Sequence, residues 1–155
     1  MRKLFYLVIP IIVISASCTK KDGLTEAERK AIGQYKFEKV TIQKGFLKNE
    51  NITQQYNNMI LQLNDKKEAA LIDQNNSITY FGKYDVVTET NTTYTDDDGN
   101  TSSSTNNTII IDIDHPTRGG NGWYWHGRNA SIGNKKMRFT DERAEGRYSF
   151  VLDKI

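Results

Sequence analysis

Two aspartates and two histidines lie close together in the chain, and these residue types can hold a metal ion or move protons. Asp112, Asp114 and His115 fall within four residues, and His126 follows eleven residues later. Carboxylate and imidazole groups are common zinc ligands and general acids or bases. Their spacing matches no metal-binding or catalytic motif, and outward positions on half-buried strands account for both aspartates. We therefore expect no catalytic residue, no metal and no cofactor.

A second acidic cluster, Asp96-Asp97-Asp98-Gly99-Asn100, has oxygen ligands that suit calcium. The EF-hand loop requires glycine at its sixth position and a glutamate at its twelfth. Here glycine comes fourth, and position twelve is Asn107. The dipeptide Asp98-Gly99 instead favours a tight turn, so we expect a solvated hairpin tip.

Large aromatic side chains form the third group of residues that could bind a ligand. The candidate residues for lining a pocket are Trp123, Trp125, Tyr80, Tyr84 and Ile111. Rings of this kind stack against apolar or ring-bearing molecules. The alternative is that the same side chains simply fill the interior of the fold, because a small barrel has little room to spare.

The elements that position these residues begin with one short helix. Thr25 and Glu28 form a capping-box pattern, and Gly33 supplies a stop signal. Each of the two side chains can satisfy a free amide at the start of a helix. The sequence therefore predicts a helix over residues 26–32.

From residue 34 onward, alternating apolar and polar residues predict β-strands joined by short polar turns. Tyr35 and Phe37 alternate in one phase, Val40 and Ile42 in the other, so a bulge is expected near residues 38–39. The predicted strands are 35–42, 59–63, 69–73, 78–86, 109–113, 122–132, 135–139 and 147–152. Residues 91–108 are polar and form either the tip of a long hairpin or a loop.

Eight consecutive strands after one helix predict an all-β fold. Eight antiparallel strands close naturally into an up-and-down barrel, and a two-sheet β-sandwich is the alternative. Residues 25–155 would form this single domain, which is of ordinary size for one core.

The first 18 residues indicate export. Arg2 and Lys3 precede an apolar run over residues 4–14, and small residues follow up to Cys18, the one cysteine of the chain. This pattern is typical of a signal peptide, predicted here over residues 1–17. A cysteine at this position resembles the acceptor site of bacterial lipoproteins. That resemblance implies a lipidated Cys18, a tether over residues 18–24 and attachment to the outer membrane, facing either the periplasm or the cell surface. The alternative is an uncleaved N-terminal helix.

Charge argues against nucleic acid as a partner. Without residues 1–17, the chain carries 19 Lys and Arg against 19 Asp and Glu, which leaves no net charge. Binding to a phosphate backbone requires a concentrated positive field.

A family resemblance rests on four features of the chain. They are the helix that leads into Gly33-Gln34-Tyr35, the regular succession of strands, the segment 127–132 and the terminal residues 148–155. In these features the chain resembles the lipocalin-like lipoproteins of Bacteroidota. Lipocalins carry tryptophan where Tyr35 stands, and a late arginine that packs over it; the resemblance assigns that role to Arg147. It also implies a barrel whose open end can hold a small apolar molecule.

Two functions follow as expectations, and neither involves catalysis. In the first, the anchored barrel binds a small hydrophobic ligand among Tyr80, Tyr84, Ile111, Trp123 and Trp125. In the second, the barrel is filled and its loops, above all 91–108 and 116–122, bind a protein or glycan at the cell surface.

Overall fold

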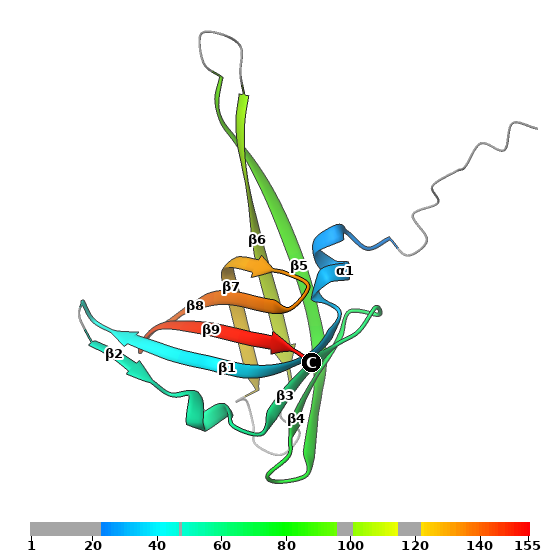
Figure 1. The fold of residues 1–155 in the computed structure, drawn as a ribbon, viewed down its shortest axis with the longest axis vertical. Helices are drawn as coiled ribbons and strands as arrows, with labels where there is room; N and C mark the ends of the chain where they lie inside the picture. Colours follow the sequence, from blue (N-terminus) through cyan, green and yellow to red (C-terminus); the bar gives the residue numbers. More distant parts are fainter. Residues whose placement is uncertain (1–22, 47, 96–100, 115–121) are drawn as a thin grey trace, which may run out of the picture.

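The computed structural model describes residues 23–46, 48–95, 101–114 and 122–155, and of residues 91–95 and 101–103 it describes the backbone alone. The fold is a closed eight-stranded antiparallel barrel with one additional strand and one short helix (Figure 1). The predicted barrel is therefore confirmed.

All eight predicted strands form, and several are longer than predicted. The strands are β1 (Gly33–Lys44), β2 (Lys48–Asn51), β3 (Met59–Leu63), β4 (Glu68–Asp73), β5 (Ile78–Thr95), β6 (Thr101–Ile113), β7 (Trp123–Ile132), β8 (Lys136–Arg143) and β9 (Gly146–Lys154). Strands β3 to β8 each pair with the next strand in the chain, as in a meander. The polar segment is thus a hairpin, built by the outer parts of β5 and β6.

Pairing between the first and last long strands closes the barrel. Strand β9 pairs antiparallel with β1 from Tyr35↔Lys154 to Gln43↔Arg147. A register shift between Phe37 and Lys39 marks the predicted bulge and moves the inward phase from Phe37 to Val40. Because the two edges of one continuous sheet meet here, the sandwich alternative is wrong.

The additional elements lie where β1 leaves β3. Strand β1 pairs with β3 only over residues 33–36, and with β2 over residues 41–44. The 3₁₀ helix η1 (Thr53–Tyr56) occupies the space between, and the Thr53 hydroxyl bonds to both the amide and the carbonyl of Val40. Strand β2 and η1 were not predicted, because all four residues of β2 are exposed and give no alternation.

Helix α1 (Glu26–Ala31) covers one end of the barrel, with the predicted capping box between Thr25 and Glu28. Buried Glu28 also accepts a 2.7 Å ion pair from Lys67 in the β3–β4 turn. Below the helix, the Tyr35 hydroxyl donates to the carbonyl of Ala31 (2.9 Å), and burial raises the pKa of Tyr35 to about 12. The hydroxyl is therefore a permanent donor at neutral pH.

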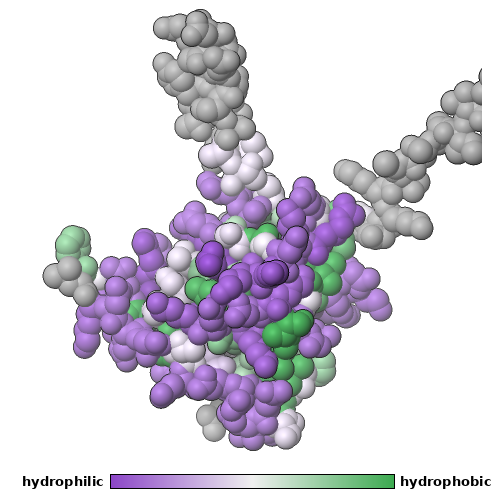
Figure 2. All heavy atoms as spheres, viewed as in Figure 1, coloured by the Kyte–Doolittle hydropathy of each residue, from purple (hydrophilic) through white to green (hydrophobic). Residues whose placement is uncertain are grey.

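One apolar cluster fills the barrel, and it draws a side chain from every strand except β2. Its largest fully buried members are Trp125, Tyr35, Phe150, Leu61, Leu63, Leu71, Ile109, Ile111, Ile113, Met137, Leu152 and Val40. Polar residues cover most of the wall facing the viewer in Figure 2, and apolar residues show there only in patches. Every described element and core residue lies between Leu24 and Ile155, so this segment contains all that the described fold needs.

Candidate functional site

Two of the five candidate ligand residues come together at the end of the barrel next to η1. Trp123 and Trp125 both face inward from β7, and their rings stack with centroids 5.7 Å apart. Tyr56 of η1 packs edge-on against Trp123 at 6.1 Å. Phe37 and Phe150 complete the cluster around Trp125, at 6.4 and 6.2 Å.

The other three candidates line different parts of the interior. Tyr84 lies at the opposite end, where its hydroxyl donates to the carbonyl of Asn64 (2.8 Å) in the β3–β4 turn. Ile111 is fully buried between Tyr84 and Trp125, its cross-strand neighbours. Tyr80 is 8% exposed on β5. Tyr84, Ile111 and Trp125 thus form one inward cross-strand row, in which Tyr84 directs its hydroxyl to the β3–β4 turn and Trp125 stacks on Trp123.

Side chains occupy the space beside the tryptophans. Gly127, two residues after Trp125, has no side chain, and the Phe139 ring and Ile109 take up the room. A Cβ added at Gly127 would lie 2.6 Å from Phe139 Cδ2 and 2.7 Å from Ile109 Cγ2. Phe139 in turn stacks on Phe150 at 4.8 Å. This interior is packed with protein atoms, as a small barrel allows.

One polar atom in this packed region lacks a partner. Trp125 is 1% exposed, and its indole Nε1–H makes no hydrogen bond. An unpaired buried donor costs about 1–3 kcal/mol, so such atoms are rare in native interiors. It is the one described feature of the interior that favours a missing acceptor, such as a ligand oxygen.

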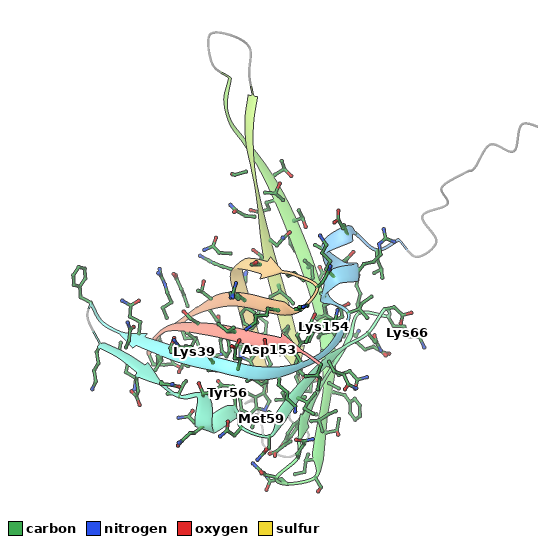
Figure 3. All side chains as sticks on the ribbon, in the orientation of Figure 1. Lys39, Tyr56, Met59, Lys66, Asp153 and Lys154 are labelled. Carbon is green, nitrogen blue, oxygen red and sulfur yellow. The ribbon has the colours of Figure 1, made fainter. Side chains whose placement is uncertain are left out.

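A small hollow opens through the wall beside η1. It has a volume of about 170 Å³ and lies where β1 and β3 separate, between Phe37, Tyr56 and Met59 with the amides of Asn57, Asn58 and Gln74 nearby. Figure 3 labels Tyr56 and Met59 below β1 at this point. Ligand pockets usually start at about 300 Å³, so a drug-sized molecule needs more room than this hollow provides.

An inward-facing ion pair lies near the same end and was missed by the sequence analysis. Asp141 is 4% exposed and binds Arg143 Nε at 2.8 Å; Arg143 also lies 4.8 Å over the Tyr148 ring. Arg143 Nη2 donates to the carbonyl of Tyr124. The alternation Met137, Phe139, Asp141 on β8 was the available signal, since it places the carboxylate inside.

A hairpin projects past α1 (Figure 1). We call residues 86–95 of β5 and 101–106 of β6 the ribbon. Pairing of β5 with β4 ends at Lys83, and pairing of β6 with β7 ends at Asn107, while the two ribbon strands pair with each other. The ribbon therefore has two free edges.

Hydrogen bonds at the base of the ribbon identify the groups on its β5 edge. The amide of Tyr84 donates to the carbonyl of Lys67 on the β4 side, whereas the carbonyl of Phe81 accepts from Asp114, next to β6. Backbone groups alternate between the two sides of a strand. The amides of Val86, Thr88 and Thr90 consequently point to the free edge.

Among the described residues, no group of three or more His, Cys, Asp and Glu side chains is placed to hold a metal ion. Asp112 and Asp114 are exposed, and His126 is half-buried on β7. His115 and the Asp96–Asn100 segment lie outside the described residues, as does most of the loop 116–122.

Lys154 packs over the Tyr35 ring, and not Arg147 as the family resemblance implied. Lys154 Nζ lies 5.7 Å from the centre of the Tyr35 ring and donates to the carbonyl of Lys30. Arg147 lies at the other end of β9, opposite Gln43, and forms an exposed ion pair with Glu142. The assignment of Arg147 to this role is therefore wrong.

Within the described part of the chain, no helix has the length and apolarity to cross a membrane. Comparisons with protein-family models, with curated proteins and with solved structures gave no match to this chain.

Proposed function

We propose that this chain is an outer-membrane lipoprotein, anchored through Cys18, that binds a polypeptide partner through its ribbon without catalysis. The observation that carries the proposal is the combination of a packed interior with a projecting hairpin whose edges are both unpaired. An exposed sheet edge binds an extended peptide through main-chain hydrogen bonds. The amides of Val86, Thr88 and Thr90 supply the donors on the β5 edge.

The anchor rests on the sequence pattern that ends at Cys18. Diacylglycerol on the cysteine sulfur plus an amide-linked chain provides more than the two signals that stable attachment requires. The Cys18→Ala variant should lose lipid labelling and be released from membranes. Continued membrane association of this variant would contradict the anchor.

The ribbon is tested with a photo-crosslinking amino acid at residue 89, which is exposed on β5, in the full chain and in its own envelope. We expect one dominant adduct at residue 89 and none with the crosslinker at Asn75, which lies in the β4–β5 turn. Thr90→Pro should abolish the adduct, because proline removes an edge-facing donor and leaves the pairing with β6 intact. Thr90→Val keeps the amide and is the matched control. Adducts that survive Thr90→Pro would refute the edge as the binding site.

A small apolar ligand held beside Trp125 is the second candidate, and the unpaired indole N–H favours it. Residues 19–155 would be purified gently from the envelope and weighed by native mass spectrometry. This candidate predicts an added mass that Trp125→Phe removes and Tyr124→Phe retains, since Tyr124 is 52% exposed on the outer face. A bare chain in all three samples would eliminate it.

A further inference from the structure

We propose that one outer wall of the barrel rests on the anionic headgroups of the membrane, with the ribbon directed away from that surface. This cationic wall consists of Lys36, Lys39, Arg128, Lys136 and Arg138, on strands β1, β7 and β8 around β9. The orientation it describes depends on the proposed lipid anchor at Cys18, whereas the charge of the wall does not.

The strand register places these cations in rows across neighbouring strands. Lys39 on β1 and Arg138 on β8 are both opposite Val151 of β9. Figure 3 shows Lys39 and Asp153 on the wall that faces the viewer. The side chains of Lys39 and Arg138 are exposed, because the inward positions next to them are Val40, Met137 and Phe139.

A second row contains the acidic residues of the wall. Lys36 and Lys136 are both opposite Asp153, and Lys136 also binds Glu38 at 2.6 Å. Arg128 extends the cations onto β7, opposite Thr140. Glu142 of β8 and Arg147 of β9 form a further exposed ion pair on this face, and the remaining five cations against two carboxylates leave the wall positive.

The ribbon grows from the opposite side of the barrel. In the closed ring the order is β1, β3, β4, β5, β6, β7, β8, β9, so β5 is diametrically opposite β9 and β6 opposite β1. Residues 78–114, from the start of β5 to just past β6, contain seven Asp and Glu against a single lysine, Lys83. Residues 33–51 and 122–155 together contain eleven Lys and Arg against six Asp and Glu. The chain is neutral without residues 1–17, yet its charge is separated across the barrel.

Chain length excludes an end-on attachment at α1. Leu24 is buried and is six residues from Cys18, so the anchor lies within about 20 Å of it at full extension. Figure 1 shows the ribbon extending past α1 at the same end of the barrel. From residue 86 to residue 95 it spans about 30 Å. With that end against the membrane, the ribbon would have to enter the bilayer, so the barrel must lie on its side.

Electrostatics selects which side faces the lipid. A lysine or arginine near an anionic surface strengthens binding about fivefold. Turning the β9–β1 wall to the membrane gains this attraction and lifts the acid-rich β5–β6 side away from the headgroups. The free edges of the ribbon then remain accessible to a partner.

The test of the wall uses residues 23–155, which carry every described element and lack Lys20, Lys21 and the lipid. Vesicles of phosphatidylcholine with about three tenths phosphatidylglycerol are titrated at about 0.01 M salt, where the Debye length is about 30 Å. We expect Lys39→Glu/Arg138→Glu to weaken binding at least tenfold. The control Lys66→Glu/Lys83→Glu makes the same change in net charge in the β3–β4 turn and on β5, outside the cationic wall, and should weaken binding less than twofold; Figure 3 labels Lys66 in that turn.

Three results would overturn this inference. Equal losses in the two double variants would mean that only net charge matters. Absence of binding to anionic vesicles would remove the membrane as the occupant. Wall-dependent binding to dextran sulfate without binding to vesicles would make the wall a site for polyanions in place of lipid.

Orientation is measured on the full, lipidated chain, in which acylation occupies the one native cysteine. A fluorophore on Ser149→Cys, in the wall, should be quenched more strongly by headgroup spin labels than one on Phe81→Cys, on the far wall. Equal quenching contradicts the orientation. If Cys18→Ala remains bound to the membrane while the vesicle experiment gives the expected result, the lipid anchor is refuted. The binding of the cationic wall to anionic lipid is then still supported.

Discussion

At the residue scale, the barrel is filled because inward positions alternate in size. Gly127 on β7 faces Phe139 on β8 and Ile109 on β6. Because glycine has no side chain, the larger side chains of β8 and β6 fill the space beside it. Close packing of this kind leaves little tolerance for added volume. The tryptophan pair at the next inward positions is held by the same arrangement.

Gly127→Ala tests how full the interior is. The added methyl group would collide with Phe139 and Ile109, so we expect the free energy of unfolding to fall by about 1–3 kcal/mol. Gly133→Ala is the control, because its nearest neighbour would be the carbonyl of Lys136 at 3.3 Å; it should cost less than about 1 kcal/mol. Urea unfolding measures both. If Gly127→Ala leaves the free energy of unfolding unchanged, the barrel contains free space at this position.

At the scale of elements, the Glu28 carboxylate joins α1 to the barrel at the start of the helix, while Tyr35 and Lys154 bind the carbonyls of its last turn. Glu28 caps the helix through Thr25 and binds Lys67, which also binds Asp85 on β5 at 2.9 Å. Burial opposes the charge of Glu28, but the bonds from Lys67 and Thr25 outweigh it and lower the pKa of this carboxyl. The helix therefore depends on Glu28 remaining ionised.

Glu28→Gln should make this dependence measurable. We expect a loss of about 1–2 kcal/mol in the free energy of unfolding at neutral pH. Because the folded pKa lies below the unfolded one, the wild-type advantage is present above about pH 4.3 and disappears as pH falls through the folded value. Glu26→Gln, whose side chain is 82% exposed in its pair with Lys30, should cost less than about 0.5 kcal/mol. A difference that persists at pH 2 would refute the ionic explanation.

The ribbon is an element whose removal should leave the barrel intact. Asn91 is paired with Ser104, so replacing residues 92–103 by Asn-Gly closes the same register with a two-residue turn. The excised strands pair only with each other, and we expect the melting temperature to change by less than about 4 °C. Circular dichroism during heating provides the value. A larger drop would show that the ribbon stabilises the barrel.

At the scale of the whole molecule, closure depends on β9. This strand bridges β1 and β8, and its Phe150 contacts rings from four other elements: Phe37, Tyr56, Trp125 and Phe139. Local hairpins form from neighbouring segments, but the β1–β9 pairing joins residues more than 100 positions apart. Such pairing becomes favourable only when the core assembles with it.

Phe150→Ala should therefore destabilise the whole barrel. Loss of this buried ring is expected to cost about 3–5 kcal/mol in the free energy of unfolding. Val151→Thr, on the outer face of the same strand, should change it by less than about 1 kcal/mol. Chemical denaturation followed by tryptophan fluorescence reports on both variants. Comparable losses would mean that β9 acts through its backbone alone.

The sequence by itself determined what local chemistry can specify. The capping box predicted α1, the phase change at Phe37 and Val40 predicted the bulge, and the alternation of Trp123 and Trp125 predicted that both rings share a face. These follow from nearest neighbours along the chain. The count of eight strands then favoured a barrel, since strands of a meander pair in order.

Only the tertiary structure decided which residues meet across the barrel. It directed the Tyr84 hydroxyl to the β3–β4 turn, placed Lys154 instead of Arg147 over Tyr35, and positioned η1 where β1 separates from β3. It also set the cations of β1 and β8 in rows on the side opposite the ribbon. Register and ring closure fix these positions, and both arise from contacts between segments far apart in the chain, which local patterns do not encode.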